Sequence, residues 1–472
     1  MKLIKYIKKH ILPLSIVLFS LFICTLNYTP DTYLTGWDTL HPELNFPLNF
    51  KRLIFGLWRS EQGLGAVAGH SHMADLPRVL ILWLLNIFLP TNFLRYAYIF
   101  FCFILGPLGI FYLVKFIFNK NKHSQTIALL SSLFYIFNLA TIQHFTVPFE
   151  MFPTQYAFLP WIILLALSSI HHPTKKNLLV FSLITFFSTP QSYAAHLWYP
   201  FFLALSVSLL IYTYFSKTKP KIALTLIGLT LAINSYWLLP NLYFIKTSSH
   251  IPQNFKGNQL HSQEFLLRNR QTGNLSDTSI NKGFYLNWEI YDFAQTRATS
   301  LMPTWNSHLQ KLDTKIIGLT LFTASLIGLI YGLKNKHPFA FATLPFFIPS
   351  FILLANTTPP FNFLFNLLLK ISFLKETLRF IYTKVSIIYQ YSLVIYFTLF
   401  LKLITSKLKN LKFVTITTVC LLLIYSFPIL SPHQLISDKI KVNIPQKYFD
   451  TWTFFKNQPQ GTILTLPLHN PT

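Results

Sequence analysis

The sequence is poor in charge. Only 11% of its 472 residues are Asp, Glu, Lys or Arg, against roughly 25% in an ordinary soluble domain. Hydrophobic residues make up 52%, and apolar runs of near-spanning length recur along most of the chain. An apolar helix needs about 20 residues to cross the hydrocarbon core of a bilayer. The composition therefore excludes a soluble enzyme and a disordered chain, and it predicts an all-α, polytopic integral membrane protein.

Cysteine is scarce as well. The three cysteines, Cys24, Cys102 and Cys420, all fall in apolar runs. They have neither metal-ligand spacing nor a partner suggested by position, which excludes a secreted disulfide scaffold. The chain also lacks a P-loop, a G-x-S-x-G elbow and a kinase signature. The net charge of +25 comes from lysines in short loops, where they fix topology, so no nucleic-acid partner is expected.

We expect about eleven transmembrane helices. The basic segment 1–9 precedes an apolar stretch without a small-residue cleavage site, which favours an uncleaved first span and a cytoplasmic N-terminus. An odd number of spans then leaves the C-terminus extracytoplasmic. The expected spans are 11–28, 94–114, 126–143, 155–170, 178–190, 197–215, 222–241, 316–333, 338–356, 380–404 and 411–430.

Two further apolar runs are too short to cross. Residues 77–90 would form a helix of about 21 Å at 1.5 Å per residue, against a core of roughly 30 Å, and 361–375 is similar. Both are expected to lie at the membrane interface. So is an amphipathic helix near 46–61, whose apolar residues recur in steps of three and four. Treating 77–90 as a span would turn the lysine-rich loops outward, against the positive-inside bias.

Acidic residues gather in the first outer loop. Asp31, Asp38 and Glu43 follow the first span closely. A carboxylate fixed at the membrane surface can take the proton of a sugar hydroxyl that attacks a lipid-linked donor. The alternative is that these are ordinary solvated loop acids, because Pro42 leaves no regular element to hold Asp38 and Glu43 together.

Arginine gives a second lead. Only eight of the 39 basic residues are Arg, and Arg52, Arg59, Arg78 and Arg95 lie in or beside the first loop. The guanidinium fork binds phosphate oxygens in a bidentate way that Lys cannot match. Snorkelling to lipid headgroups is the alternative for Arg78 and Arg95.

Histidines and amides carry weaker signals. His70, His72 and Asp75 match no tight metal spacing, so no metal is expected, and hydrogen bonding or contact with a phosphate is favoured. Within the spans, polar exceptions are few, and single amides such as Gln390 usually join helices together. The near absence of intramembrane ionisable residues argues against an ion-coupled carrier.

The first loop also carries a series of short motifs. They are Pro30-Asp-Thr32, Gly36-Trp-Asp38, Pro42-Glu43, Arg52, Gly56-Leu-Trp58, Gly63-Leu-Gly65, Gly69-His70 and Asp75-Leu-Pro-Arg78. In these residues the chain resembles the N-terminal domain of the α-(1→3)-arabinofuranosyltransferase family of GT-C membrane glycosyltransferases. It is also similar to the YfhO-like membrane proteins. Later segments, Pro148–Pro153 and Leu374–Phe380 with Lys384, suit the same pattern.

The resemblance implies a GT-C fold, a helical bundle with an acidic first outer loop and juxtamembrane helices, and a polyprenyl-phosphate sugar donor. The expected organisation is a transmembrane GT-C-like domain over 1–430, with outer loops 29–93 and 244–315. Residues 431–472 would begin an extracytoplasmic, β-rich C-terminal domain, with 461–467 as a first strand that is cut short.

The sequence thus predicts an inverting GT-C glycosyltransferase of the cell envelope. It would transfer a sugar from a polyprenyl-phosphate donor to a glycan or glycolipid acceptor at the outer face of the cell membrane. Asp38 is the first choice for the general base, followed by Glu43 and Asp31. The residues expected to hold the donor phosphate are Arg59, Arg78, Arg52, His70, Arg379 and Lys384. Direct displacement requires no cofactor.

Three rival functions stay open. A transporter or flippase for a lipid-linked saccharide predicts polar residues along a path through the bundle. An O-antigen polymerase or ligase predicts Arg and His at the centre of a late outer loop. A non-enzymatic envelope assembly protein is the third.

Overall fold

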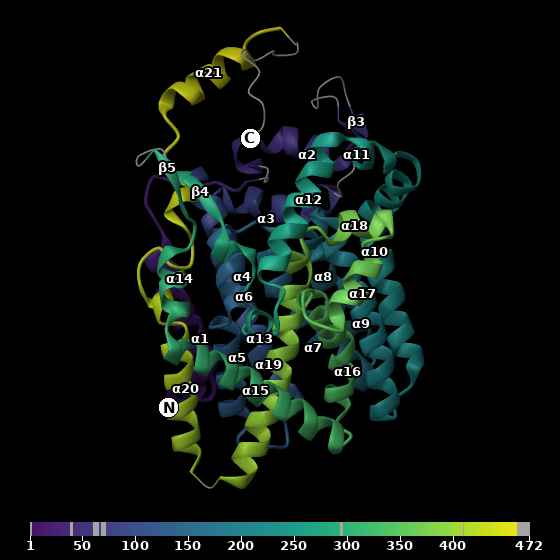
Figure 1. Ribbon diagram of the computed structural model, residues 1–472, viewed down its shortest axis with the longest axis vertical. Coiled ribbons are helices and arrows are strands. Elements are labelled where there is room, and N and C mark those ends of the chain that lie inside the picture. Colours follow the sequence, from purple (N-terminus) through teal and green to yellow (C-terminus); the bar gives the residue numbers. More distant parts are fainter. Residues whose placement is uncertain are drawn as a thin grey trace.

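The computed structural model describes residues 2–37, 41–59, 66–67, 72–292, 296–408 and 410–459, with no side-chain detail for 2–10 and for a few residues elsewhere. Helices dominate this part of the chain, and its short strands form three two-stranded antiparallel sheets (Figure 1). The protein is therefore an all-α polytopic membrane protein, as its composition predicts.

Six of the described helices are long and apolar enough to cross a membrane. A bent pair, α5 (Ser124–Ile136) and α6 (Leu139–Thr146), turns by 44° and would make a seventh if it is one span. The six are α4 (Thr91–Ile117), α7 (Met151–His171), α9 (Ala195–Ser216), α10 (Pro220–Ser248), α15 (Leu312–Lys334) and α19 (Ile381–Lys407).

The expected count of eleven is not met. Four expected spans correspond to shorter helices: the apolar part of α1 (Lys2–Asn27), α8 (Lys175–Phe187), α16 (Pro338–Leu354) and α20 (Leu411–Tyr425). A helix of 15 residues, as in α20, reaches only about 22 Å, and the core is roughly 30 Å thick. Proline sets one boundary: α8 gives way to η3 (Thr189–Tyr193), which has Pro190 in its first turn.

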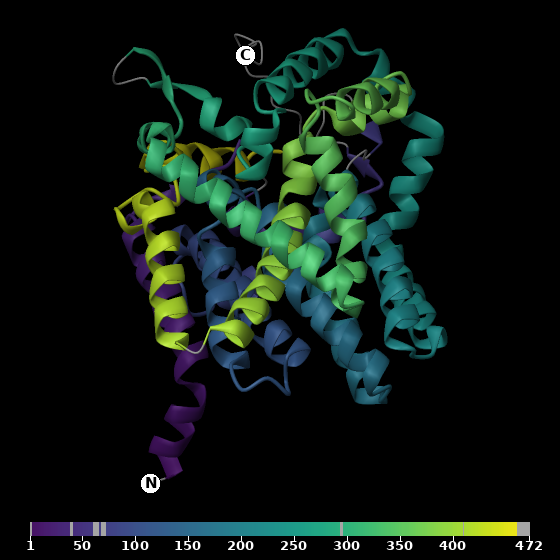
Figure 2. The same ribbon diagram turned by 60° about the horizontal axis from the view of Figure 1, so that its bottom comes forward.

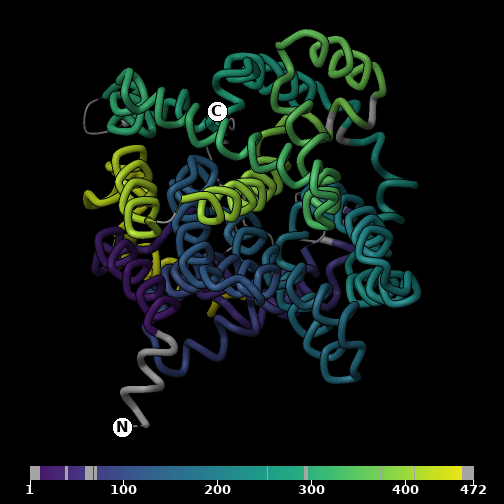
Figure 3. The backbone as a smooth tube through the Cα atoms, turned by 90° about the horizontal axis from the view of Figure 1, so that it is seen from below, coloured from purple at the N-terminus to yellow at the C-terminus, as the bar shows by residue number. Residues whose placement is uncertain are grey.

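Helix α19 forms the centre of the bundle. It is buried along most of its length and packs against α5, α15 and α16 (Figure 3). The crossing with α15 depends on Gly328, where an added Cβ atom would collide with the backbone oxygen of Tyr396. Glycine lets the two backbones approach closely, as is common between membrane helices. Helices α1 and α20 lie at one edge of the bundle and α8 to α10 at the other (Figures 1 and 2).

The short elements gather at one end of the bundle, the upper end, at the top of Figure 1. Which side of the membrane this end faces stays a prediction. The sequence between α10 and α15 forms short helices and a hairpin, which extend from this end to the middle of the bundle in Figure 1. These elements are α11 (His250–Asn254), α12 (Lys256–Gln271), α13 (Leu275–Ser279), η4 (Phe284–Asn287), β4 (Glu289–Asp292), β5 (Arg297–Ser300) and α14 (Pro303–Gln310).

The expected interfacial helices are shorter than their apolar runs. The helix predicted over 46–61 is α2 (Phe46–Ile54); the Asn45 side chain accepts the Leu48 backbone N–H at its start, and a strand pair, β2 (Trp58–Arg59) with β3 (Ala66–Val67), follows. The run 77–90 overlaps the ten-residue α3 (Leu76–Leu85). The run 361–375 divides between α17 (Phe361–Leu368) and α18 (Ser372–Leu378).

The segment after α20 folds back onto the first loop. After η5 (Phe427–Leu430) and η6 (Asp438–Ile440), strand β6 (Lys441–Val442) pairs with β1 (Tyr33–Leu34). The Asn27 side chain accepts the backbone N–H groups of Leu435 and Ile436, each at 2.9 Å. Helix α21 (Gln446–Lys456) follows, and the strand expected over 461–467 lies outside the described residues.

Candidate functional site

The three residues predicted as general bases, Asp38, Glu43 and Asp31, differ in position and in exposure to solvent. Asp38, the first choice, lies outside the described residues. Asp31 is exposed in the turn after α1 and has a positive φ of 57°. Glu43 lies in η1 (Pro42–Leu44) and is buried, with only 6% of the residue exposed. The alternative of a solvated loop acid therefore does not describe Glu43.

Glu43 has an asymmetric environment. His41 contacts its Oε1 through Nδ1 at 2.9 Å, and Arg95 Nη1 lies 3.3 Å from His41 Nε2. Because a guanidinium can only donate, this contact places the His41 proton on Nδ1, directed at Glu43. The other carboxylate oxygen, Oε2, is buried and has no hydrogen-bond partner among the described residues.

Burial by itself would raise the pKa of Glu43. The contact with His41 is the main effect that offsets this, with a smaller contribution from the positive charge of Arg95, so the pKa of Glu43 lies below its ordinary value. Glu43 is consequently an ionised carboxylate in a dry environment with one unpaired oxygen. Oε2 is the free acceptor atom of this site, and the lowered pKa makes the carboxylate a weaker base than an ordinary glutamate.

Four more charged side chains lie beside Glu43. Arg78 holds Asp75 through two contacts, Nε to Oδ1 at 2.7 Å and Nη2 to Oδ2 at 2.5 Å. Glu150 Oε1 joins both arginines, 3.1 Å from Arg78 Nη1 and 2.7 Å from Arg95 Nε. We call these five residues, Glu43, Asp75, Arg78, Arg95 and Glu150, the charged cluster. Their exposed fractions range from 1% to 6%.

Five separate elements position the charged cluster at the upper end of the bundle. Glu43 comes from η1, Asp75 from η2 (His72–Asp75), Arg78 from the first turn of α3, Arg95 from the beginning of α4, and Glu150 from the start of α7. Arg95 also donates to the backbone oxygen of Leu34 at 2.6 Å. Burial raises the pKa of Asp75 despite its pairing with Arg78.

The two buried arginines direct their donors to protein groups. Both are almost fully enclosed, so neither occupies the headgroup-snorkelling position considered for them. Arg78 directs three of its nitrogens at Asp75 and Glu150. In this arrangement the guanidinium groups orient the carboxylates, and a phosphate could reach Arg78 only by displacing an acid. The role of Arg78 in donor binding stays a prediction.

The other expected phosphate ligands lie in different surroundings. Arg52 is half-buried on α2, while the side chain of Arg59 and all of His70 lie outside the description. His72 is buried and stacks on Tyr193, with ring centres 4.5 Å apart. At the start of α19, Lys384 Nζ donates to the backbone oxygen of Thr377, and Arg379 Nη1 contacts Asn258 Oδ1 at 2.5 Å. Among the described residues, no group of three His, Cys, Asp or Glu could hold a metal ion.

Sequence reasoning missed the contacts that Glu150 and Arg95 make in the charged cluster. Glu150 stood out only as part of the Pro148–Pro153 motif, and Arg95 only as one of four nearby arginines. A usable signal existed, because an arginine at the start of a long apolar helix such as α4 needs a buried acid partner.

A second polar group lies inside the bundle, where α5 and α6 are broken. His144 Nε2 is 2.6 Å from Ser386 Oγ, and Gln390 Nε2 donates to the Tyr135 oxygen at 2.7 Å and to Thr141 Oγ1 at 2.6 Å. Within the described part of the chain, His144 Nδ1 and Gln390 Oε1 have no partner. Buried unpartnered polar atoms are unusual in proteins and call for an explanation.

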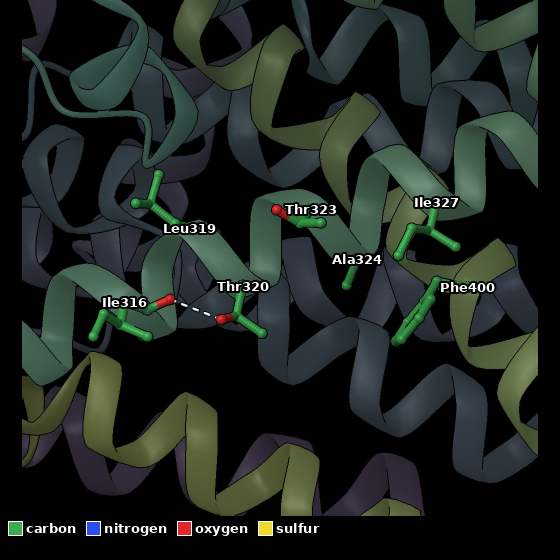
Figure 4. A pocket seen from close by; sticks show the side chains of 7 residues that line it. All are labelled: Ile316, Leu319, Thr320, Thr323, Ala324, Ile327 and Phe400. Carbon is green, nitrogen blue, oxygen red and sulfur yellow. Dashed lines mark hydrogen bonds between the residues drawn. The ribbon is translucent and has the colours of Figure 1, made fainter.

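An open groove of about 350 Å³ runs along one face of α15 (Figure 4). Its lining is apolar apart from two threonines, and the Thr320 hydroxyl is occupied by the backbone oxygen of Ile316 at 2.8 Å. No ionisable side chain lines it, so it offers no chemistry of its own. The lining residues are Ile316, Leu319, Thr320, Thr323, Ala324, Ile327 and Phe400.

Comparisons of this chain with protein-family models, with curated proteins and with solved structures find no match.

Proposed function

We propose that the chain is an inverting membrane glycosyltransferase of the GT-C type, which moves a sugar from a polyprenyl-phosphate donor to a hydroxyl of an envelope glycan or glycolipid. One observation carries the proposal. Glu43 is a buried carboxylate that stays ionised and leaves Oε2 unpaired within the described residues, in the segment that carries the family-like motifs. A general base needs this protonation state before the reaction begins.

The reaction balances in a single displacement. The acceptor oxygen forms a bond to the anomeric carbon of the donor, while the bond from that carbon to the phosphate oxygen breaks. The hydroxyl proton passes to Glu43 Oε2, and polyprenyl phosphate leaves with the bonding electrons. Attack from the opposite face inverts the anomeric configuration. Because Oε2 is shielded from solvent, the acceptor has to displace the groups that cover it.

The remaining members of the charged cluster support Glu43. Arg95 donates to His41, which holds Glu43 Oε1 and leaves Oε2 as the free acceptor. Glu150 links Arg95 to the Arg78–Asp75 pair, so the elements around the proposed base are joined in one network of ion pairs. Donor phosphate contacts are assigned to Arg52 and Arg59, which follow Glu43 closely in sequence.

The test uses the full-length protein in nanodiscs with farnesyl-phosphoryl sugars and a panel of oligosaccharide acceptors. We expect release of farnesyl phosphate that depends on acceptor, together with a product of inverted anomeric configuration. A retained configuration contradicts the single displacement. No acceptor-dependent release from any donor contradicts the proposed function.

A transporter of lipid-linked saccharides is the second candidate, because a specific observation favours it. The α5–α6 pair is broken inside the bundle, and His144 and Gln390 place unpartnered polar atoms there. Broken helices that expose polar groups form substrate sites in many transporters. Movement of a fluorescent lipid-linked saccharide across proteoliposomes, abolished in His144→Ala but unaffected in Glu43→Gln, would favour this function over transfer.

A further inference from the structure

Two tryptophans come together near the charged cluster. Trp37 lies just before the candidate base Asp38 in sequence, and its ring centre is 5.0 Å from that of Trp288, the residue before β4. Trp37 also packs against Phe149, at 5.9 Å, and Phe149 is the neighbour of Glu150. We call the side chains of Trp37 and Trp288 the tryptophan platform. It is joined to the charged cluster through Phe149.

The platform is held in place from behind. Trp288 stacks on Phe265 of α12 with ring centres 5.5 Å apart, and Trp37 lies nearly parallel to Tyr285 at 6.2 Å. The backbone of Trp288 accepts the Leu301 N–H at 2.8 Å, which closes the base of the β4–β5 hairpin. A surface fixed by packing loses little conformational entropy when a ligand binds.

Trp37 supplies the exposed ring of the platform, and Arg268 covers the ring of Trp288. Trp37 is 36% exposed, the largest fraction among the rings of this group, and Trp288 is half-buried. The guanidinium carbon of Arg268 lies 4.4 Å from the centre of the Trp288 ring. Arg268 is itself paired with Glu264 Oε1, at 2.9 Å from Nε and 2.8 Å from Nη2. The exposed indole of Trp37 therefore lies near a donor, Arg268, and an acceptor, Glu264, whose charges balance.

We propose that the tryptophan platform binds a sugar ring of the acceptor, an inference that rests on the glycosyltransferase function. A pyranose or furanose ring presents C–H groups on one face, which pack on an indole, and hydroxyls at its rim, which can bond to Arg268 and Glu264. An anionic ligand fits less well, because Arg268 is already neutralised. The donor fits less well because its phosphate is tied to a chain in the bilayer, whereas Trp288 belongs to the polar segment between α10 and α15.

In this proposal the tryptophan platform and the charged cluster have separate roles at the upper end of the bundle. The platform holds the acceptor ring, and the charged cluster deprotonates the attacking hydroxyl. Loss of the platform should weaken acceptor binding and leave donor binding and the chemical step nearly intact. Removal of an interaction of this kind raises KM without lowering kcat.

Direct binding tests the platform independently of catalysis. Saturation-transfer NMR on the nanodisc-embedded protein, with methyl glycosides of galactose, mannose, glucose and arabinofuranose, should show the strongest transfer at ring C–H protons. Trp37→Ala and Trp288→Ala should each raise Kd by about tenfold, and Trp37→Phe by less, because a phenyl ring keeps part of the stacking. Trp452→Ala, on α21 and 44% exposed, is the matched control and should have no effect.

The outcomes separate the two proposals. Glycoside binding that depends on Trp37, in a protein without sugar transfer, would leave the platform standing and overturn the glycosyltransferase. Active transfer with an acceptor KM unchanged in Trp37→Ala and Trp37→Phe would overturn the platform alone. The platform would also be overturned if no glycoside showed saturation transfer, or if Trp452→Ala weakened glycoside binding as much as Trp37→Ala does.

Discussion

Glu150→Gln should show how strongly the charged cluster holds the upper end together. The change keeps the size of the side chain but removes the charge that both Arg78 and Arg95 contact. Removing one partner of a buried ion pair costs about 3–5 kcal/mol, since the other charge is left buried without compensation. We expect the lower part of that range. Arg78 keeps Asp75, Arg95 keeps the Leu34 oxygen, and the amide oxygen of glutamine can still accept one hydrogen bond.

The assay is the free energy of unfolding in bicelles titrated with SDS. Glu264→Gln is the control, because it removes the acid of an exposed pair with Arg268, and exposed pairs contribute only about 0–1 kcal/mol. A double-mutant cycle with Arg95→Met should give a coupling energy at the upper end of the roughly 0.5–3 kcal/mol seen for contacting residues. Glu150→Gln within about 0.5 kcal/mol of the wild type, the usual range of an inert surface change, would refute the reasoning.

Three further predictions concern pH, helix packing and topology. The pKa of Glu43 in the folded protein lies below its value of about 4.3 in the unfolded chain. The Glu43 carboxylate therefore stabilises the fold above about pH 4.3, and this stabilisation is lost as the pH falls through the folded pKa. Between about pH 5 and 3 the wild type should lose more stability than Glu43→Gln, and equal losses would contradict this shift. Gly328→Ala should lower the free energy of unfolding by about 1–3 kcal/mol, because the added methyl group overpacks against α19. Gly228→Ala on α10, where an added Cβ meets no atom within 4 Å, should be neutral or stabilising. Equal effects of the two changes would contradict the close crossing of α15 and α19. Cysteines introduced at Asn86 and Asn121, which flank α4, should be labelled from outside and from inside, respectively. Labelling of position 121 from outside would mean that α3 spans.

The sequence predicted the class of fold and the longest helices, because an apolar run of about 20 residues has few alternatives in a bilayer. It overestimated the number of spans where turn chemistry interrupts a run. The stretch 126–143 is mainly apolar, yet the Asn138 side chain accepts the Ala140 N–H and starts a new helix at an angle of 44° to the first. Helix α12 was missed for the opposite reason. Its mean composition is polar, so it gives no apolar period to recognise.

The candidate site was predicted in its residue types but not in its connections. Glu43 and Arg78 were singled out from the chemistry that acids and arginines perform near phosphate. Their burial and their link through Glu150 depend on contacts between residues 72 positions apart, which no local pattern encodes. The same holds for β1 and β6, whose partners are separated by most of the chain. The three-dimensional arrangement turned a set of loop charges into one network.

The most direct measurement of the central claim compares sugar transfer by the wild type with that by Glu43→Gln. Glutamine preserves shape but cannot take the proton, so kcat should fall by about 10²–10⁴-fold, the usual contribution of a general base. Donor affinity should be unchanged, because the donor contacts are assigned elsewhere. Asp31→Asn, which removes an exposed acid of the same loop, should retain full activity. Normal turnover in Glu43→Gln would contradict the account.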